Sequence, residues 1–217
     1  MDARRATDKQ LKSMPTADLL TIMAYGEAKN LGEEGVEGVM HVLMNRSRAK
    51  GYRNFGKSLP ETVTSKYGSG EDRVFEFNAL EPRKYRETIN ALKKDKDTYL
   101  KYRNIAEEVL ADVRDDFTGG AMFFYNPNSS GSEWYKNQVK EGKFLETART
   151  VSPTNKKTLH VYHVPSDFKM GVETRKMPVI NKDYESFAPR KRIPDSIGGS
   201  FLFRGSDYET GGATPAF

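Results

Sequence analysis

The chain has 217 residues, a formal net charge of +5 and no cysteine. The lack of cysteine excludes disulfides, zinc thiolate sites and cysteine nucleophiles, and the three histidines form no His-Glu-x-x-His motif, so we expect neither a metal nor a cofactor. No apolar run approaches the roughly 20 residues of a membrane span, and the N-terminus has no apolar signal-peptide core, so we expect no membrane span and no signal peptide.

A chain of this length can form one domain with a hydrophobic core plus an appendage. Its basic charge favours an anionic polymer as partner, which includes nucleic acid, teichoic acid and peptidoglycan. Lys and Arg residues are interspersed with Asp and Glu residues along the whole chain, and no nucleic-acid-binding motif stands out. We therefore expect no nucleic-acid partner.

The first predicted helix begins near Thr16, a good N-cap residue, after a charged leader over residues 1–15 that we expect to be flexible. Its apolar residues recur at helical spacing on one face, and this face runs into the carboxylate of Glu27. Burial disfavours the charged form of a carboxyl group and raises its pKa, which suits a general acid working near neutral pH. The alternative is that Glu27 marks the helix end and turns toward solvent.

A second helix is expected directly after the short connection at residues 30–32. Glycine inside a helix costs roughly 1 kcal/mol relative to alanine. Gly35 and Gly38 near its start therefore indicate close approach by another backbone or by a ligand.

The rest of the chain favours a mixed architecture. Pro82 suits the first turn of a third helix, and a fourth is expected over residues 98–113. Short apolar runs at residues 121–125 and 159–164 are typical of strands in a small antiparallel sheet. We predict an α+β fold in which a groove separates a helical body, residues 16–50 and 81–113, from a sheet lobe, residues 120–164.

Four stretches of the chain carry a resemblance to a known family. They are residues 25–28 (YGEA), the pairs Glu34-Gly35 and Asn45-Arg46, residues 119–135 (GGAMFFYNPNSSGSEWY) and residues 158–163 (TLHVYH). In this order they resemble the SleB/CwlJ-type cell wall hydrolases, which are spore-cortex-lytic enzymes and phage-encoded relatives that cleave the glycan strands of peptidoglycan. The resemblance spans residues 18–164 and implies a catalytic domain over residues 16–164 with a compact, lysozyme-like arrangement.

The resemblance also implies roles for individual residues. It makes Glu27 the catalytic acid and places His160, not His163, at the family's histidine. Six residues are expected to supply stacking surfaces and hydrogen bonds to the sugar: Phe77, Tyr125, Asn126, Trp134, His160 and Tyr162. Two alternatives stay open, since Phe77 could equally be a core residue and a lone histidine on a strand is more often structural than catalytic.

The number of acids in the matched stretches bears on the reaction. Most glycosidases use two carboxylates. Many family members carry a second acid four residues after the first, where this chain has Leu31. A lytic transglycosylase needs only one, so we expect that reaction, with a muramidase-type hydrolase using Glu34 or Glu76 as second acid left open.

The resemblance does not cover residues 165–217, which are rich in proline and glycine with scattered aromatic residues. Such a segment cannot fold alone but can order on a partner. We expect it to tether a phage endolysin to other virion proteins, so that the protein resides in the virion, or in the host cytoplasm before lysis, and acts on the cell wall. The alternative is an inactive virion protein that uses the domain only for binding to the wall.

Overall fold

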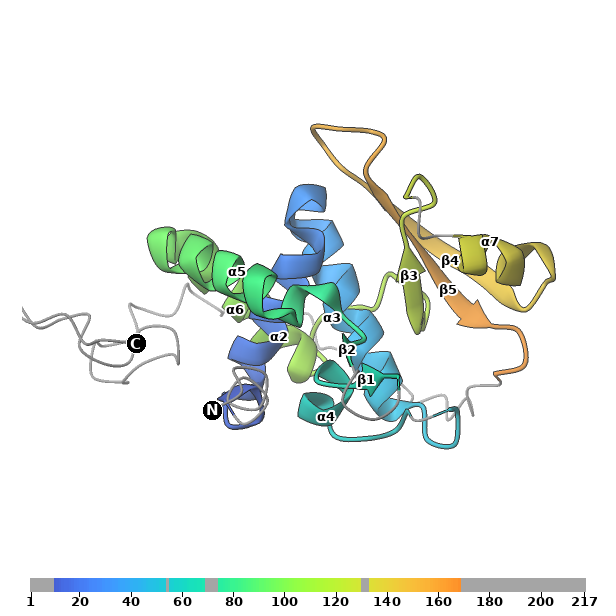
Figure 1. Cartoon of the computed structure of the whole chain (residues 1–217), viewed down its shortest axis with the longest axis horizontal. Helices are drawn as coiled ribbons and strands as arrows, with labels where there is room; N and C mark the ends of the chain where they lie inside the picture. Colours follow the sequence, from blue (N-terminus) through green and yellow to red (C-terminus); the bar gives the residue numbers. More distant parts are fainter. Residues whose placement is uncertain (1–9, 54, 69–73, 130–132, 169–217) are drawn as a thin grey trace, which may run out of the picture. The chain divides into compact units, whose positions relative to one another are not determined.

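The computed structural model describes residues 10–53, 55–68, 74–129 and 133–168 (Figure 1). All of them belong to one unit that ends at Phe168. Residues 1–9 of the predicted leader and residues 169–217 of the predicted tail lie outside the described residues.

The helical body is built around one helix, α2, which contacts α3, α5 and α6 (Figure 1). The bounds are Thr16–Ala28 for α2, Gly32–Arg48 for α3, Pro82–Lys94 for α5 and Lys96–Leu110 for α6, with the short 3-10 helix η1 (Lys29–Leu31) between α2 and α3. Pro82 occupies the first turn of α5, as predicted. The α+β fold and the predicted helical body are confirmed.

The central helix α2 is buried on almost every side, since each residue from Ala17 to Ala24 is buried. The apolar residues that predicted one buried face are buried, and the other faces of α2 are buried as well, because α3, α5 and α6 cover them. Even the Asp18 side chain is fully buried, where it accepts hydrogen bonds from the Tyr99 hydroxyl at 2.6 Å and from Arg103 Nε at 2.9 Å. These two partners compensate the burial of the carboxylate and tie α2 to α6.

The start of α2 differs from the prediction in two ways. Residues 10–12 are helical, and the side chains of Leu11 and Met14 are buried. A flexible leader was therefore the wrong expectation for residues 10–14, because these two apolar side chains reach the core. Thr16 is the first residue of the helix rather than its cap, which is Pro15.

Between α3 and α5 the chain forms short elements. Their bounds are Leu59–Val63 for helix α4, Lys66–Tyr67 for β1, Val74–Phe75 for β2, and Asn78–Leu80 for the 3-10 helix η3. Helix α4 begins after Ser58, where Ser58 and Glu61 form a capping box. The antiparallel pair β1 and β2 leads the chain into η3.

The sheet lobe has three antiparallel strands in the order β3-β5-β4. Their bounds are Phe123–Tyr125 for β3, Phe144–Val151 for β4 and Leu159–Pro165 for β5. Strands β3 and β5 confirm the two predicted strands, whereas β4 was not predicted. Only Phe144 and Thr150 of β4 are buried, so this edge strand lacks the apolar pattern that reveals strands in a sequence.

One face of this sheet packs on helix α3. There Tyr162 of β5 forms a fully buried cluster with Val42 and Ala121. A Cβ on Gly38 would lie 2.6 Å from Cζ of Tyr162, so only glycine fits at this position of α3. The close approach predicted at Gly38 is therefore made by an aromatic side chain rather than by a backbone or a ligand. At Gly35 it is the side chain of Leu31 that approaches.

The opposite face of the sheet packs against the short helix α7 (Glu133–Lys140). Phe123 and Phe144 stack here with ring centroids 4.6 Å apart, and Tyr135 of α7 packs against both strands. Phe168, just after β5, closes this cluster by contacting Tyr52 at 5.3 Å between ring centroids. The folded unit therefore continues past residue 164, where the sequence had placed the start of the tail.

Candidate active site

The carboxylate of Glu27 lies at the end of α2 against η3. Its Oε1 accepts a hydrogen bond of 2.7 Å from the backbone N–H of Ala79. A Cβ on the preceding Gly26 would lie 2.7 Å from the Ala79 side chain, so glycine lets η3 approach the helix this closely. Gly26 therefore allows η3 to pack closely against α2, and this close packing brings the Ala79 N–H to the Glu27 carboxylate.

Glu27 is half-buried, and this burial raises the pKa of its carboxyl group above the usual value. The Ala79 N–H and the positive charge of Lys84 oppose the shift by lowering the pKa, but they do not cancel it. The arrangement can hold a proton on the carboxyl group at a higher pH than an exposed glutamate does. That is the chemistry required of a general acid.

A row of rings leads from η3 to β5. Phe77 stacks on Phe124 with centroids 6.4 Å apart, and Phe124 in turn contacts His160 at 4.6 Å. His160 lies edge-on to Tyr162 at 6.2 Å between ring centroids, and the two residues, two positions apart on β5, share the sheet face toward α3. Phe77 is only 4% exposed and thus also belongs to the core. Phe124, which the sequence interpretation left out, is the link in this row.

His160 and Tyr162 are both uncharged at neutral pH. Burial lowers the pKa of His160 to about 4. Burial likewise raises the pKa of Tyr162 to about 12, with a smaller opposite effect from the Thr150 hydroxyl and a smaller increase from the charge of Glu34. A neutral imidazole suits hydrogen bonding to uncharged sugar groups, whereas the Tyr162 phenol is fully buried.

Tyr125 and Trp134 lie on the other face of the sheet. Tyr125 stacks on Tyr135 of α7 at 5.0 Å and also contacts His163 at 5.3 Å. Trp134 packs edge-on against Tyr135 and remains 47% exposed. The structure therefore divides five of the six predicted binding residues into two groups: Phe77, His160 and Tyr162 on one side of the sheet, and Tyr125 and Trp134 on the other.

Asn126 follows β3 and shapes the turn there. Its Oδ1 accepts a hydrogen bond of 2.9 Å from the backbone N–H of Asn128, the geometry of an Asx-turn. The Asn126 side chain therefore has a role in this turn. Its predicted contact with a sugar remains a prediction.

A family model described as Cell Wall Hydrolase matches residues 31–148, which is more than half of the chain. The chain belongs to the Cell Wall Hydrolase family. The match includes Phe77, Tyr125 and Trp134, and lies between Glu27 and His160 in the sequence. No curated protein and no solved structure matches the chain. Membership supports hydrolysis of peptidoglycan in general terms, and a peptidoglycan substrate.

The two other acids that the sequence left open differ in their surroundings in this cell wall hydrolase. Glu76 is occupied, since its Oε1 accepts from Arg46 Nη1 and its Oε2 from Ser65 Oγ, each at 2.6 Å. Arg46 is itself buried and donates through Nε to the Met122 carbonyl at 2.6 Å. Glu34 is exposed on the first turn of α3. Neither environment resembles that of Glu27.

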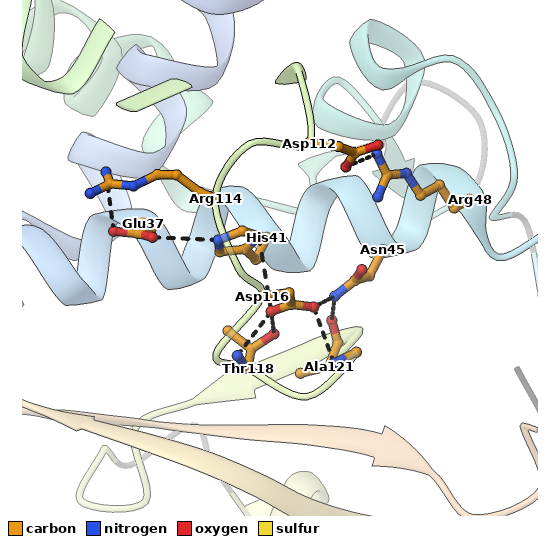
Figure 2. A network of polar contacts seen from close by, with 10 residues as sticks. Glu37, His41, Asn45, Arg48, Asp112, Arg114, Asp116, Thr118 and Ala121 are labelled. Carbon is orange, nitrogen blue, oxygen red and sulfur yellow. Dashed lines mark hydrogen bonds and ion pairs between the residues drawn. The ribbon is translucent and has the colours of Figure 1, made fainter. Parts of the chain in front are cut away.

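A polar network that the sequence interpretation missed fixes the sheet lobe to α3 (Figure 2). Asp116 accepts hydrogen bonds from Asn45 Nδ2 at 2.8 Å and from the N–H and hydroxyl of Thr118. Asn45 also donates to the Ala121 carbonyl at 3.1 Å. The network thereby sets the position of β3, and the Asn45-Arg46 pair was the sequence signal for it.

In Figure 2 the imidazole of His41 lies between two acids of this network. Its Nε2 is 3.5 Å from Glu37 and its Nδ1 is 3.9 Å from Asp116. Within the described ranges, no group of three or more His, Cys, Asp and Glu side chains is arranged to hold a metal ion. None of the helices in the described part of the chain is long and apolar enough to cross a membrane.

Proposed function

We propose that this chain cleaves the glycan strand of peptidoglycan between N-acetylmuramic acid and N-acetylglucosamine, as a lytic transglycosylase with Glu27 as its single catalytic residue. The observation that carries the proposal is the half-buried Glu27 carboxyl group, whose pKa burial raises and whose position the Ala79 N–H fixes. General acid–base assistance of this kind is commonly worth about 10²–10⁴-fold.

The reaction needs one proton transfer in each direction. Protonated Glu27 donates its proton to the glycosidic oxygen, and the bond between that oxygen and C1 of the muramoyl sugar breaks. Ionised Glu27 then takes the proton of the muramoyl 6-hydroxyl while that oxygen bonds to C1 and closes a 1,6-anhydro ring. The carboxyl group ends protonated, and no water is consumed.

The surroundings of the other two acids support a mechanism with one carboxylate. Both Glu76 oxygens accept hydrogen bonds, from Arg46 and from Ser65, which occupies this carboxylate within the protein. Glu34 is solvent-exposed, so nothing desolvates it for a catalytic role. Glu27, by contrast, is half-buried at the junction of α2 and η3, and this burial raises the pKa of its carboxyl group.

Neutral side chains would hold the sugar beside Glu27. We assign this role to His160 on the α3 side of the sheet, with Phe77 and Phe124 as apolar surface and the fully buried Tyr162 packed behind the imidazole. Because β3 is an edge strand, a glycan crossing that edge would also meet Tyr125 on the other face, followed by Asn126 and Trp134. The two groups would then contact successive sugars of one strand.

The products of digestion test the proposal. Purified sacculi are digested with the full-length protein in ¹⁸O-labelled water, and the muropeptides are analysed by mass spectrometry. We expect muramic ends that are lighter by one water than hydrolysed ends and that carry no label. Labelled reducing ends would instead show a hydrolase with a second acid.

We also propose that the enzyme is a virion-associated phage lysin, tethered by the segment after Phe168. The proline, glycine and scattered aromatic residues of this segment, together with the basic cluster at residues 190–192, suit binding along a partner surface. Removing residues 169–217 keeps Phe168 in its contact with Tyr52. The truncated protein should still cleave sacculi but be lost from purified particles, and incorporation at the wild-type level would rule out the tether. If the full-length protein does not cleave sacculi at all, the result would favour the alternative of an inactive virion protein that binds the cell wall.

A further inference from the structure

Three buried polar atoms cluster on the sheet face toward α3. They are Oγ1 of Thr150, Nδ1 of His160 and the hydroxyl oxygen of Tyr162, and none has a hydrogen-bond partner of normal geometry among the described residues. Thr150 is 1% exposed, His160 8% and Tyr162 0%. A buried polar group left unpaired costs about 1–3 kcal/mol, so three together require an explanation.

The register of the sheet brings the three side chains together. Thr150 of β4 lies directly opposite His160 of β5, and Tyr162 follows two residues later on the same face. The ring centroids of His160 and Tyr162 are 6.2 Å apart. The Thr150 hydroxyl is close enough to Tyr162 to lower the pKa of that phenol.

The three groups are also chemically complementary. The tyrosine hydroxyl can donate one proton, the threonine hydroxyl can both accept and donate, and a neutral imidazole has one bare nitrogen that only accepts. Two hydrogen bonds, from Tyr162 to Thr150 and from Thr150 to His160, would therefore satisfy all three atoms.

We propose that Thr150 is a positioning residue that accepts a hydrogen bond from Tyr162 and donates one to Nδ1 of His160, thereby fixing the imidazole as the Nε2–H tautomer. Nδ1 is enclosed, so the small exposed fraction of the ring belongs to its other atoms. Nε2–H would then be the donor that His160 offers to a sugar oxygen. This last step rests on the proposed function, whereas the tautomer itself does not.

The tautomer can be measured without substrate by ¹⁵N NMR of the imidazole nitrogens in the full-length protein near neutral pH. The signals of His160 are assigned by their loss in His160→Gln. We expect the Nε2–H tautomer in the wild type, a shift toward Nδ1–H in Thr150→Val, and recovery of the wild-type signals in Thr150→Ser, which restores the hydroxyl. Thr147→Val is the matched control on the same strand, because the Thr147 hydroxyl donates to the Tyr162 carbonyl at 3.3 Å instead.

An Nδ1–H tautomer in the wild type, or an unchanged His160 signal in Thr150→Val, would overturn the proposal. If Thr150→Val does not fold, the wild-type spectrum still decides the tautomer, and Thr150→Ala removes the hydroxyl in its place. Sacculus cleavage by Thr150→Val should be about threefold to tenfold slower, the size expected for one lost neutral hydrogen bond. If the protein does not cleave sacculi, this activity comparison cannot be made, but the NMR measurement still tests the tautomer.

Discussion

The backbone N–H of Ala79 donates a 2.7 Å hydrogen bond to the Glu27 carboxylate and so fixes the acid at the junction of α2 and η3. This bond favours the ionised carboxylate, while burial favours the protonated form and is the larger effect. The carboxyl group is therefore held in one place by a contact that does not remove its raised pKa. A glutamine at this position could accept the same hydrogen bond.

The raised pKa of Glu27 predicts that Glu27→Gln increases thermal stability at neutral pH. Since the folded-state pKa is above the unfolded value, the folded state binds more protons between the two, and stability falls as pH rises through that window. Glutamine carries no charge at any pH, so the variant does not lose stability in this window. The difference in Tm between variant and wild type should grow from about pH 4 to about pH 8. A difference that stays constant over this range would show that the Glu27 pKa is not raised.

The pKa of His160, lowered to about 4 by burial, predicts a stability change on the acid side. The unfolded state binds a proton near the usual value of 6.5 while the folded state does not, so stability is lost as pH falls between these two values. An NMR titration of the His160 ring should have its midpoint near 4. His160→Gln should flatten the dependence of stability on pH over the same window, and a ring that titrates near the usual value would contradict the burial.

Arg46 should contribute more to stability than its neighbour Arg48 on the same helix. Arg46 is 3% exposed and bonds both Glu76 and the Met122 carbonyl, so Arg46→Ala should cost about 1.5–3 kcal/mol for hydrogen bonds to a charged group. Arg48 pairs with Asp112 at the surface, and Arg48→Ala should cost about 0–1 kcal/mol. Urea denaturation measures the free energy of unfolding of both variants. Equal losses of stability would show that the hydrogen bonds from Arg46 to Glu76 and Met122 add nothing beyond a surface ion pair.

The sequence was informative where structure depends on local pattern. The helices around residues 16–50 and 81–113, the strands β3 and β5, and the shared face of His160 and Tyr162 all follow from periodicity or from single residues such as Pro82. Strand β4 escaped prediction because an edge strand with two buried residues carries no such pattern.

Contacts between distant segments could not be predicted in this way. The Ala79 N–H reaches Glu27 across 52 positions of the chain, and Asn45 reaches Asp116 across 71. A period of two could have shown that Phe124 and Tyr125 face opposite sides of the sheet. It could not have shown that one side meets α3 and the other α7, because that choice depends on tertiary packing.

The most direct test of the account is the activity of Glu27→Gln on purified sacculi. The amide keeps the size and the acceptor oxygen of the side chain but cannot donate the acid proton, so cleavage should fall by about 10²–10⁴-fold in a protein with a wild-type circular dichroism spectrum. Glu34→Gln, assayed beside it, should keep wild-type cleavage because this acid is exposed and outside the proposed mechanism. Folded Glu27→Gln that releases muropeptides at the wild-type rate would contradict the assignment of Glu27 as the catalytic acid.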